Sequence, residues 1–283
     1  EVRRRDEVGR LTESFASMRT ALRRHIEWLK TTTAAKERIE SELDIARSIQ
    51  MSLVPRTFPP FPERDDIELF AMLDPARDIG GDFYDFFMEK DDHLCLVVGD
   101  VSGKGVPAAL FMAVTRTFLR TIWNMERDPA ATLARLNNEL ARDNDPNMFV
   151  TLFCARIHLP TGRCVYANGG HNPPLVVRAG EPIRQIPKVK GTLVGGLEDM
   201  KYEEGTLDLR PGDMLFLYTD GVTEAMNPDE VLTGDEWTVR ELEKVRAKDC
   251  EGLVRDMRES LRRYAAGAEQ SDDITMLAFR LKK

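Results

Sequence analysis

Four prolines at positions 55, 59, 60 and 62 divide the chain into two parts with different hydrophobic periodicity. A helix cannot run through such a cluster, because proline lacks a backbone N–H and clashes with the preceding turn. Residues 8–54 contain no proline and only one glycine, a composition typical of a long helix. The residues beyond the prolines follow the shorter period of strands. We therefore expect a helical rod followed by a separate domain, with the boundary near residues 55–62.

The rod carries an apolar seam with a seven-residue repeat. Nine of its 13 positions are apolar, and the repeat persists over six heptads. This pattern favours a helix of roughly 60 to 70 Å that pairs with a second copy as a coiled coil, over a single amphipathic helix packed on the domain. Four seam residues are polar, and we expect them to specify the register or to let the rod transmit a signal: His25, Thr32, Lys36 and Gln50.

The start of the rod, from Asp6 to Leu11 and then Phe15 and Met18, resembles the second helix of a HAMP linker, which joins a membrane-spanning sensor to a cytoplasmic output domain. We assign residues 1–29 to this HAMP remnant, 30–58 to a coiled-coil or helical linker, and 59–283 to the output domain. No stretch approaches the ~20 apolar residues of a membrane span, and no signal peptide opens the chain. We expect a cytoplasmic fragment of a protein anchored in the inner (cytoplasmic) membrane through upstream segments.

The output domain is expected to be an α+β domain with layers of sheet and helix. Apolar runs predict strands at 67–73, 93–98, 148–157, 164–167, 214–218 and 274–281. Helical patterns lie at 107–123, 130–141, 236–246 and 251–264. Because strands and helices do not alternate strictly, a purely parallel sheet is not indicated.

Charge and cysteine content restrict the class of protein. Residues 1–58 carry 12 Lys and Arg against 9 Asp and Glu, so the rest of a chain with net charge −8 carries −11. An acidic domain argues against nucleic acid as a partner and is compatible with cations. The four cysteines lie far apart and form no C-x-x-C pair, which is typical of reduced thiols in a cytoplasmic protein.

Acidic residues at the ends of apolar strands are the most informative feature of the domain. They are Asp82, Asp100, Asp220 and the adjacent pair Asp272 and Asp273, each beside a glycine or another aspartate. One such residue is usually a turn or cap aspartate. Several that converge would repel one another unless cations lie among them. Oxygen ligands without a His or Cys cluster favour Mg²⁺ or Mn²⁺ over zinc.

Five ordered motifs resemble PPM-type serine/threonine phosphatases, specifically the bacterial SpoIIE/RsbU branch. The resemblance covers residues 43–283 and implies a sandwich of two β-sheets flanked by helices, with two metals at one end. The motifs are Gly80-Gly-Asp-Phe-Tyr-Asp85, Asp100-Val-Ser-Gly-Lys-Gly105, Gly170-His-Asn-Pro-Pro174, Thr219-Asp-Gly-Val-Thr-Glu224 and Asp272-Asp-Ile-Thr275.

The resemblance also implies roles for individual residues. Asp100 would bridge the two cations, Asp82 and the carbonyl of Val101 would complete the first site, and Asp220 with Asp272 would hold the second. Asp273 is the alternative to Asp272. Asp82 and Asp100 are thus the expected catalytic residues, with Mn²⁺ or Mg²⁺ as cofactors and direct attack of water on phosphorus.

Three other residues were considered for contacts with phosphate or for acid catalysis. Arg77 is a candidate for gripping phosphate, although a surface ion pair is the simpler expectation. Lys104 could approach phosphate, but a solvated turn lysine is the default. His171 could act as a general acid, yet its glycine and proline neighbours first indicate a tight turn.

The implied substrate is phosphoserine or phosphothreonine on a regulatory protein, plausibly an anti-sigma-factor antagonist, and the rod would control activity by shifting helices near the metal ligands. A catalytically silent binding module is the main alternative. A diguanylate cyclase is less favoured, because Phe83 and Tyr84 follow Gly80-Gly81-Asp82 where Glu-Phe would be expected. A P-loop at residues 99–104 fails because the spacing is one residue short and Gly105 replaces Ser or Thr.

Overall fold

The computed structural model describes residues 7–145, 147–246 and 248–283. The chain divides into two units, Glu1–Ser48 and Ile49–Lys283. The second unit begins before the expected boundary at residue 59, because Gln50 and Val54 are already buried in it. Part of the predicted HAMP segment, residues 1–6, lies outside the described residues.

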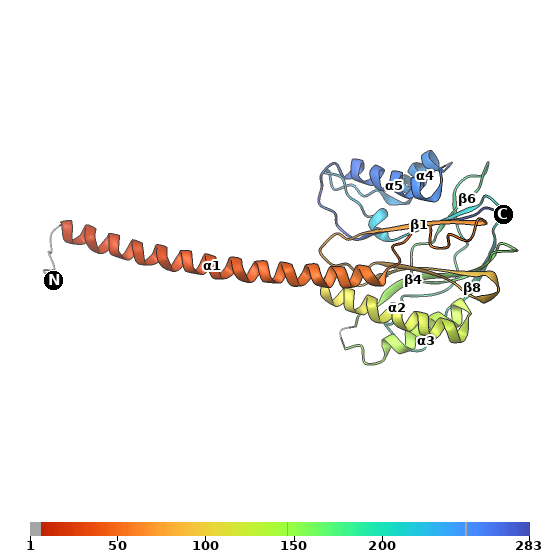
Figure 1. Cartoon of the computed structure of the whole chain (residues 1–283), viewed down its shortest axis with the longest axis horizontal. Helices are drawn as coiled ribbons and strands as arrows, with labels where there is room; N and C mark the ends of the chain where they lie inside the picture. The colour runs from red at the N-terminus through yellow and green to blue at the C-terminus, as the bar shows by residue number, and fades with distance from the viewer. Residues whose placement is uncertain (1–6, 146, 247) are drawn as a thin grey trace. The chain divides into compact units, whose positions relative to one another are not determined.

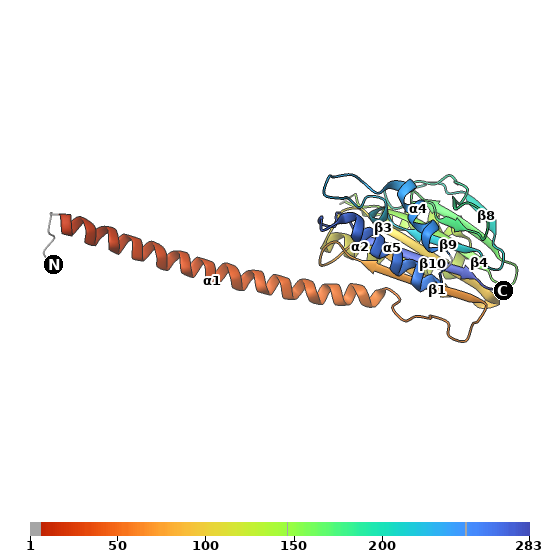
Figure 2. The same ribbon diagram turned by 90° about the horizontal axis from the view of Figure 1, so that it is seen from above.

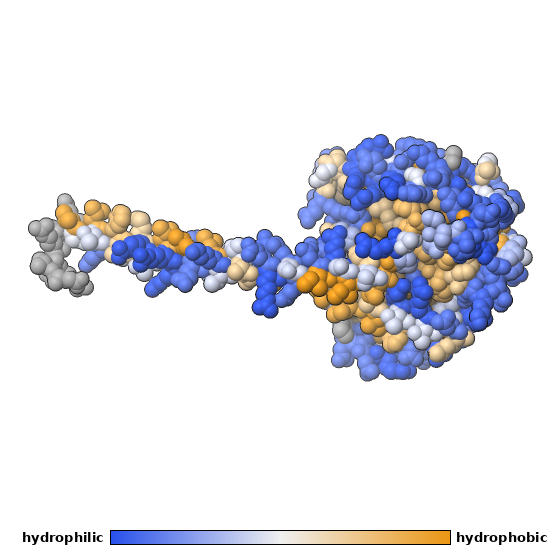
Figure 3. Space-filling view, viewed as in Figure 1, coloured by the Kyte–Doolittle hydropathy of each residue, from blue (hydrophilic) through white to orange (hydrophobic). Residues whose placement is uncertain are grey.

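From Glu7 onward the first unit is helical: α1 spans Glu7–Leu53 without interruption, as the proline-free sequence predicts. Its seam residues Leu11, Phe15, Met18 and Leu22 are all more than half exposed. Figure 3 shows hydrophobic residues gathered along the upper edge of the N-terminal part of this rod. Pairing of the rod with a second copy stays a prediction.

The second unit contains two five-stranded antiparallel sheets. One sheet has the order β1-β10-β9-β6-β7, and the other has the order β2-β3-β4-β5-β8. The strands of the first are β1 (Ile67–Asp74), β10 (Ile274–Leu281), β9 (Met214–Tyr218), β6 (Leu175–Val177) and β7 (Arg184–Gln185). Those of the second are β2 (Phe83–Met88), β3 (His93–Val101), β4 (Val150–His158), β5 (Arg163–Gly169) and β8 (Glu204–Asp208).

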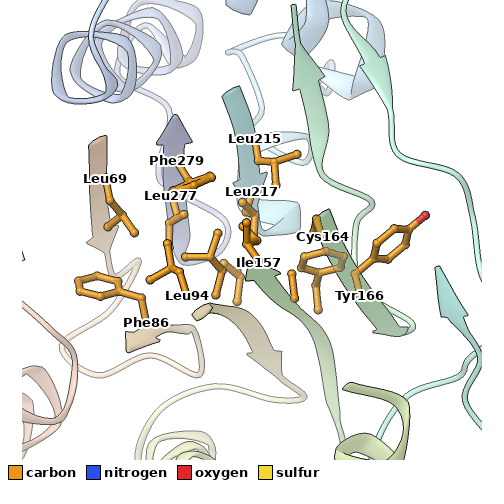
Figure 4. Close-up of a cluster of buried hydrophobic side chains, with 14 of the residues drawn as sticks. Leu69, Phe86, Leu94, Ile157, Cys164, Tyr166, Leu215, Leu217, Leu277 and Phe279 are labelled. Carbon is orange, nitrogen blue, oxygen red and sulfur yellow. The ribbon is translucent and has the colours of Figure 1, made fainter. Parts of the chain in front are cut away.

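Helices cover the outer face of each sheet, which makes four layers (Figures 1 and 2). The first sheet packs against α4 (Gly234–Val245) and α5 (Cys250–Ala265), and the second against α2 (Val106–Glu126) and α3 (Pro129–Ala141). A third apolar cluster fills the space between the sheets, where Leu94 and Ile157 meet Leu217 and Leu277 (Figure 4). The α+β fold expected from the sequence, with two sheets flanked by helices, is confirmed.

Strand β3 illustrates why these strands are apolar on both faces. Leu94, Leu96 and Val98 belong to the cluster between the sheets, whereas Cys95 and Val97 face the helices. Both sets are fully buried, because each face of the strand is covered by another layer. The same arrangement carries the strand's last residues, Asp100 and Val101, out to the edge of the apolar core.

In the part of the chain that the structure describes, no helix is both long and apolar enough to cross a membrane. The four cysteines are buried and unpaired.

Candidate metal centre

The loop that precedes β2 depends on two glycines. A Cβ atom on Gly80 would lie 1.9 Å from Oδ2 of Asp273, and one on Gly81 would lie 2.8 Å from the carbonyl oxygen of Val101. Any side chain at these positions would therefore push the loop away. The two glycines bring Asp82 up to the Val101 carbonyl and to the start of β10.

Asp82 is buried and held from the opposite sheet. Its Oδ2 accepts a hydrogen bond of 2.7 Å from Thr219 Oγ1, which in turn accepts one of 3.0 Å from the backbone N–H of Thr275. The pKa of Asp82 is raised well above its usual range, first by burial and then by the charges of Asp100 and Asp273. Its anionic form therefore requires positive charge nearby.

Asp100 and Asp220 show the same electrostatic conflict. Burial, followed by the charges of Asp220 and Asp272, raises the pKa of Asp100 to about 7. Burial, followed by the charges of Glu224 and Asp272, raises that of Asp220 to about 6. Asp220 lies at the start of the short helix Asp220–Val222, directly after β9. Segments distant in sequence thus place carboxylates near enough to disfavour one another's ionisation.

The adjacent aspartates at the start of β10 differ in their contacts. Asp273 is buried, and its two oxygens accept hydrogen bonds from the backbone N–H groups of Ala76 (2.9 Å) and Gly81 (2.7 Å). Asp272 is partly exposed, and its Oδ2 lies 2.9 Å from Nζ of Lys104. Asp273 is occupied in fixing the loop before β2, whereas the Oδ2 atom of Asp272 has, among the described residues, only the Lys104 ammonium group as a partner. This favours Asp272 as the ligand.

Replacing each aspartate separately tests this difference. Asp273→Asn is expected to lower the free energy of unfolding by about 2 kcal/mol, because the backbone N–H groups of Ala76, Gly81 and Asp82 lose their charged acceptor. Asp272→Asn is expected to leave stability nearly unchanged and to lower Mn²⁺-dependent hydrolysis of p-nitrophenyl phosphate about 100-fold. Urea unfolding and steady-state kinetics of both variants give the comparison. The reverse pattern would assign the metal to Asp273.

The donor set fits hard divalent cations. It comprises four or five carboxylates and one backbone carbonyl, with no His or Cys among them, as Mg²⁺ and Mn²⁺ prefer. Among the described residues, no three His, Cys, Asp or Glu side chains already close around a single point. Mg²⁺ keeps several waters rather than a full protein cage, so it needs only some of these oxygens as ligands.

The structure shows the contacts of the three residues considered for phosphate binding or acid catalysis. Arg77 is exposed and makes no ion pair with any described residue, which does not support the expected surface pair. Lys104 is not merely solvated, because Nζ also donates a 2.6 Å hydrogen bond to the carbonyl of Ser271. His171 is buried, its Nδ1 lies 2.9 Å from Thr151 Oγ1, and burial lowers its pKa to about 4, so it is neutral at pH 7.

Two residues near the centre were not singled out from the sequence as site residues. Thr219 holds Asp82, and its place beside Asp220 in the Thr-Asp-Gly motif is the signal that could have revealed it. Gln50 was predicted as a seam position of the rod. Instead its buried side chain donates a 2.5 Å hydrogen bond to the carbonyl of Gly80 and accepts one of 3.3 Å from the Gly80 N–H.

Comparison with known proteins agrees with this geometry. Residues 90–282 match the family model described as Stage II sporulation protein E (SpoIIE). Protein IcfG of Synechocystis sp. is 31% identical over 97% of this chain and 46% of its own length. Phosphoserine phosphatase RsbU of Bacillus subtilis is 26% identical over 89% of this chain and 74% of its own length. This chain thus spans about half of IcfG.

The same architecture occurs in a solved structure. The SiaA-PP2C domain of Pseudomonas aeruginosa superposes with a TM-score of 0.77 at 23% identity, and covers 87% of this chain and 98% of that domain. Two helix-flanked sheets with carboxylates at one end define the PP2C (PPM) class of phosphatase fold. The chain belongs to the SpoIIE family.

Proposed function

We propose that this chain is a metal-dependent protein serine/threonine phosphatase that hydrolyses phosphoserine or phosphothreonine on a regulatory protein. The observation that carries the proposal is that four distant segments place Asp82, Asp100, Asp220 and Asp272 at one end of the sheets, where burial and then neighbouring carboxylates raise the pKa of Asp82, Asp100 and Asp220. Such a cluster is costly in a protein without cations. The family and the phosphatase fold supply the reaction class.

In the proposed centre, Asp82 and the Val101 carbonyl would hold one divalent cation, Asp220 and Asp272 would hold the other, and Asp100 would serve both. Mn²⁺ or Mg²⁺, when bound, would lower the pKa of a coordinated water and offset charge on the phosphoryl oxygens. The protein's own contribution is orientation. Thr219 fixes the Asp82 carboxylate, Asp273 fixes the loop that carries it, and the β3–β4 pairing of Asp100 with Thr151 fixes the bridging residue.

The decisive experiment compares three substrates in the presence and absence of Mn²⁺. We expect hydrolysis of p-nitrophenyl phosphate and of a phosphoserine peptide that requires Mn²⁺ or Mg²⁺ and stops on addition of EDTA, with no turnover of GTP. Absent hydrolysis of both phosphomonoesters would favour a catalytically silent binding module, and hydrolysis that persists in EDTA would refute the metal dependence. Formation of a cyclic dinucleotide from GTP would favour the diguanylate cyclase alternative.

The proposed physiological substrate is a phosphorylated regulatory protein of the anti-sigma-factor antagonist class. RsbU, a phosphoserine phosphatase by name, aligns with 89% of this chain. Incubation with phosphorylated candidate proteins and detection of released phosphate tests this assignment. Anchoring to a membrane through an upstream HAMP linker is proposed only from the resemblance of the first residues of α1.

We further propose that the rod forms a homodimer and regulates the phosphatase. The exposed seam residues along α1 support pairing, because Leu11, Phe15 and Met18 have no apolar cover in a single chain. The hydrogen bonds between Gln50 and Gly80 support regulation. They connect the last turns of α1 to the loop that carries Asp82, so a rotation of these turns would disturb that loop.

A charge placed on the seam tests both parts of this proposal. Leu22→Lys is expected to dissociate the dimer and to change turnover, because a lysine facing its own copy is repelled and desolvated. Thr20→Lys, which adds the same charge off the seam, is the control and should remain dimeric. Light scattering gives the mass and steady-state kinetics give turnover. A monomeric wild-type chain would exclude the dimer, and unchanged kinetics after dissociation would exclude regulation by pairing.

A further inference from the structure

A cavity of about 380 Å³ lies beside the candidate metal centre. Its walls come from the C-terminal half of α5, the loop that follows β9 and the loop at residues 267–271. Cavities that bind ligands begin at about this size. None of the metal-centre residues lines it, so it is a separate feature of the domain.

The cavity is joined to the metal centre through the backbone. Gly221 and Ser271 line it, and each is bonded to a proposed ligand, Asp220 and Asp272 respectively. Consecutive Cα atoms are ~3.8 Å apart, so the cavity begins one residue from the centre on two sides. Gln270 fixes this wall, because its Nε2 donates hydrogen bonds to the carbonyls of Asp272 (2.8 Å) and Asp74 (2.9 Å).

Aliphatic side chains form part of the lining of the cavity, beside glycines and polar or charged residues. Met226, Leu261, Ala265, Ala268 and Ile274 contribute side chains to it. One charged pair in the lining is already satisfied, because Arg258 Nε donates a 2.8 Å hydrogen bond to Asp74 Oδ2. Burying an apolar group against these side chains would stabilise a complex, whereas burying a phosphate there would not.

Two charged side chains in the lining, Arg262 and Glu269, make no ion pair among the described residues, and the cationic one, Arg262, complements a phosphorylated segment. Arg262 is exposed and makes no ion pair within the described residues, whereas the matched neighbour Arg263, which does not line the cavity, donates to Ser260 Oγ (3.0 Å). A phosphoserine segment carries about −2 charge from its phosphate alone. The unpaired guanidinium of Arg262 therefore lies on the side of the metal centre where the cavity is, and could attract the phosphate of the substrate.

We propose that this cavity binds the phosphorylated protein itself, accepting an aliphatic side chain close in sequence to the phosphoserine. The proposal rests on the proposed phosphatase activity and adds substrate selection to it. An extended chain covers ~3.3 to 3.6 Å per residue, so the side chain that fits lies within about four residues of the phosphoserine. A small phosphomonoester such as p-nitrophenyl phosphate does not reach the cavity.

Synthetic phosphoserine peptides test this assignment. Each peptide carries one leucine at a different position, up to about four residues on either side of the phosphoserine, in an otherwise alanine and glycine background. At one position leucine is expected to raise kcat/KM about tenfold or more, the gain from burying one aliphatic side chain. Ala268→Phe, which fills the cavity, is expected to abolish that gain and to leave turnover of p-nitrophenyl phosphate unchanged.

The arginine pair provides the matched control. Arg262→Ala is expected to raise KM for the preferred peptide severalfold, and Arg263→Ala to leave it unchanged. Absence of a leucine preference in the wild-type chain, or its persistence in Ala268→Phe, would overturn the proposal. So would a changed oligomeric state of Ala268→Phe with unchanged peptide kinetics, which would assign the cavity to a second copy of the chain. Failure of the wild-type chain to hydrolyse p-nitrophenyl phosphate would instead refute the phosphatase activity.

Discussion

Asp100→Asn is expected to lower Mn²⁺-dependent hydrolysis of p-nitrophenyl phosphate at least about 1000-fold while the fold stays intact. Asp100 is the one side chain assigned to both cations, and a loss of several kcal/mol of charge stabilisation corresponds to this factor. The backbone of Asp100 pairs with Thr151 within β3 and β4. Asparagine keeps the size and position of the side chain and removes only its charge.

Thermal unfolding gives a second, independent result for the same variant. In the metal-free protein, burial and neighbouring carboxylates oppose ionisation of Asp100, so a neutral residue there is expected to leave the melting temperature unchanged or to raise it. Added Mn²⁺ is expected to stabilise the wild-type chain, because binding to the folded state alone shifts the equilibrium, and to stabilise Asp100→Asn much less.

The control is Asp229→Asn, an exposed aspartate in the loop between β9 and α4. It changes the net charge by the same amount and should retain wild-type turnover and the wild-type response to Mn²⁺. Full activity of Asp100→Asn with a normal Mn²⁺ shift would remove Asp100 from the centre. The shared-carboxylate arrangement would then be wrong.

Much of the fold could be predicted because periodicity is a local property. The proline-free run gave α1, and the apolar run at 93–98 gave β3, since both faces of that strand are buried. Strand β8 escaped prediction because it is an edge strand with alternating exposed residues and a glycine, Gly205. Strand β2 was missed because Asp85 interrupts its apolar run, and its burial depends on partners in another element.

In the site, too, features set by neighbouring residues could be predicted from the sequence, and features set by distant residues could not. Carboxylates at strand ends can be recognised in sequence, because a strand ending in Gly-Asp or Thr-Asp has a visible pattern. The difference between Asp272 and Asp273 cannot, because it depends on hydrogen bonds to Ala76 and Gly81, nearly 200 residues away. The contact made by Gln50 could not be predicted from the sequence for the same reason. Its heptad position indicates a helix partner, whereas its contact is the Gly80 backbone.

The pairing of Asp85 with α2 leads to the largest expected change in stability. Asp85 has no exposed surface, and its oxygens accept hydrogen bonds from Arg120 Nε (2.7 Å) and Nη2 (2.6 Å) and from the Phe86 N–H (2.9 Å). Arg116 Nε lies 3.1 Å from the same carboxylate. The carboxylate thereby joins β2, which follows Asp82, to α2, which follows Asp100.

Asp85→Ala is expected to lower the free energy of unfolding by about 3 kcal/mol, because it leaves two partly buried guanidinium groups without their anion. Partial exposure of Arg120 keeps the value at the lower end of the usual range for such changes. Urea unfolding followed by tryptophan fluorescence measures it, since Trp123 is buried on α2 and reports on this region. Turnover is expected to fall as well, because α2 begins five residues after Val101.

A double-mutant cycle separates the ion pair from the loss of packing. The double variant Asp85→Ala/Arg120→Ala is expected to lose less free energy of unfolding than the sum of the two single losses. The reason is that Arg120→Ala removes a charge that Asp85→Ala has left unpaired. Asp85→Asn, which can still accept from the Phe86 N–H, should be intermediate. Strictly additive losses would show that Asp85 and Arg120 stabilise the domain independently. The ion pair between Asp85 and Arg120 would then not couple β2, which follows Asp82, to α2, which follows Asp100.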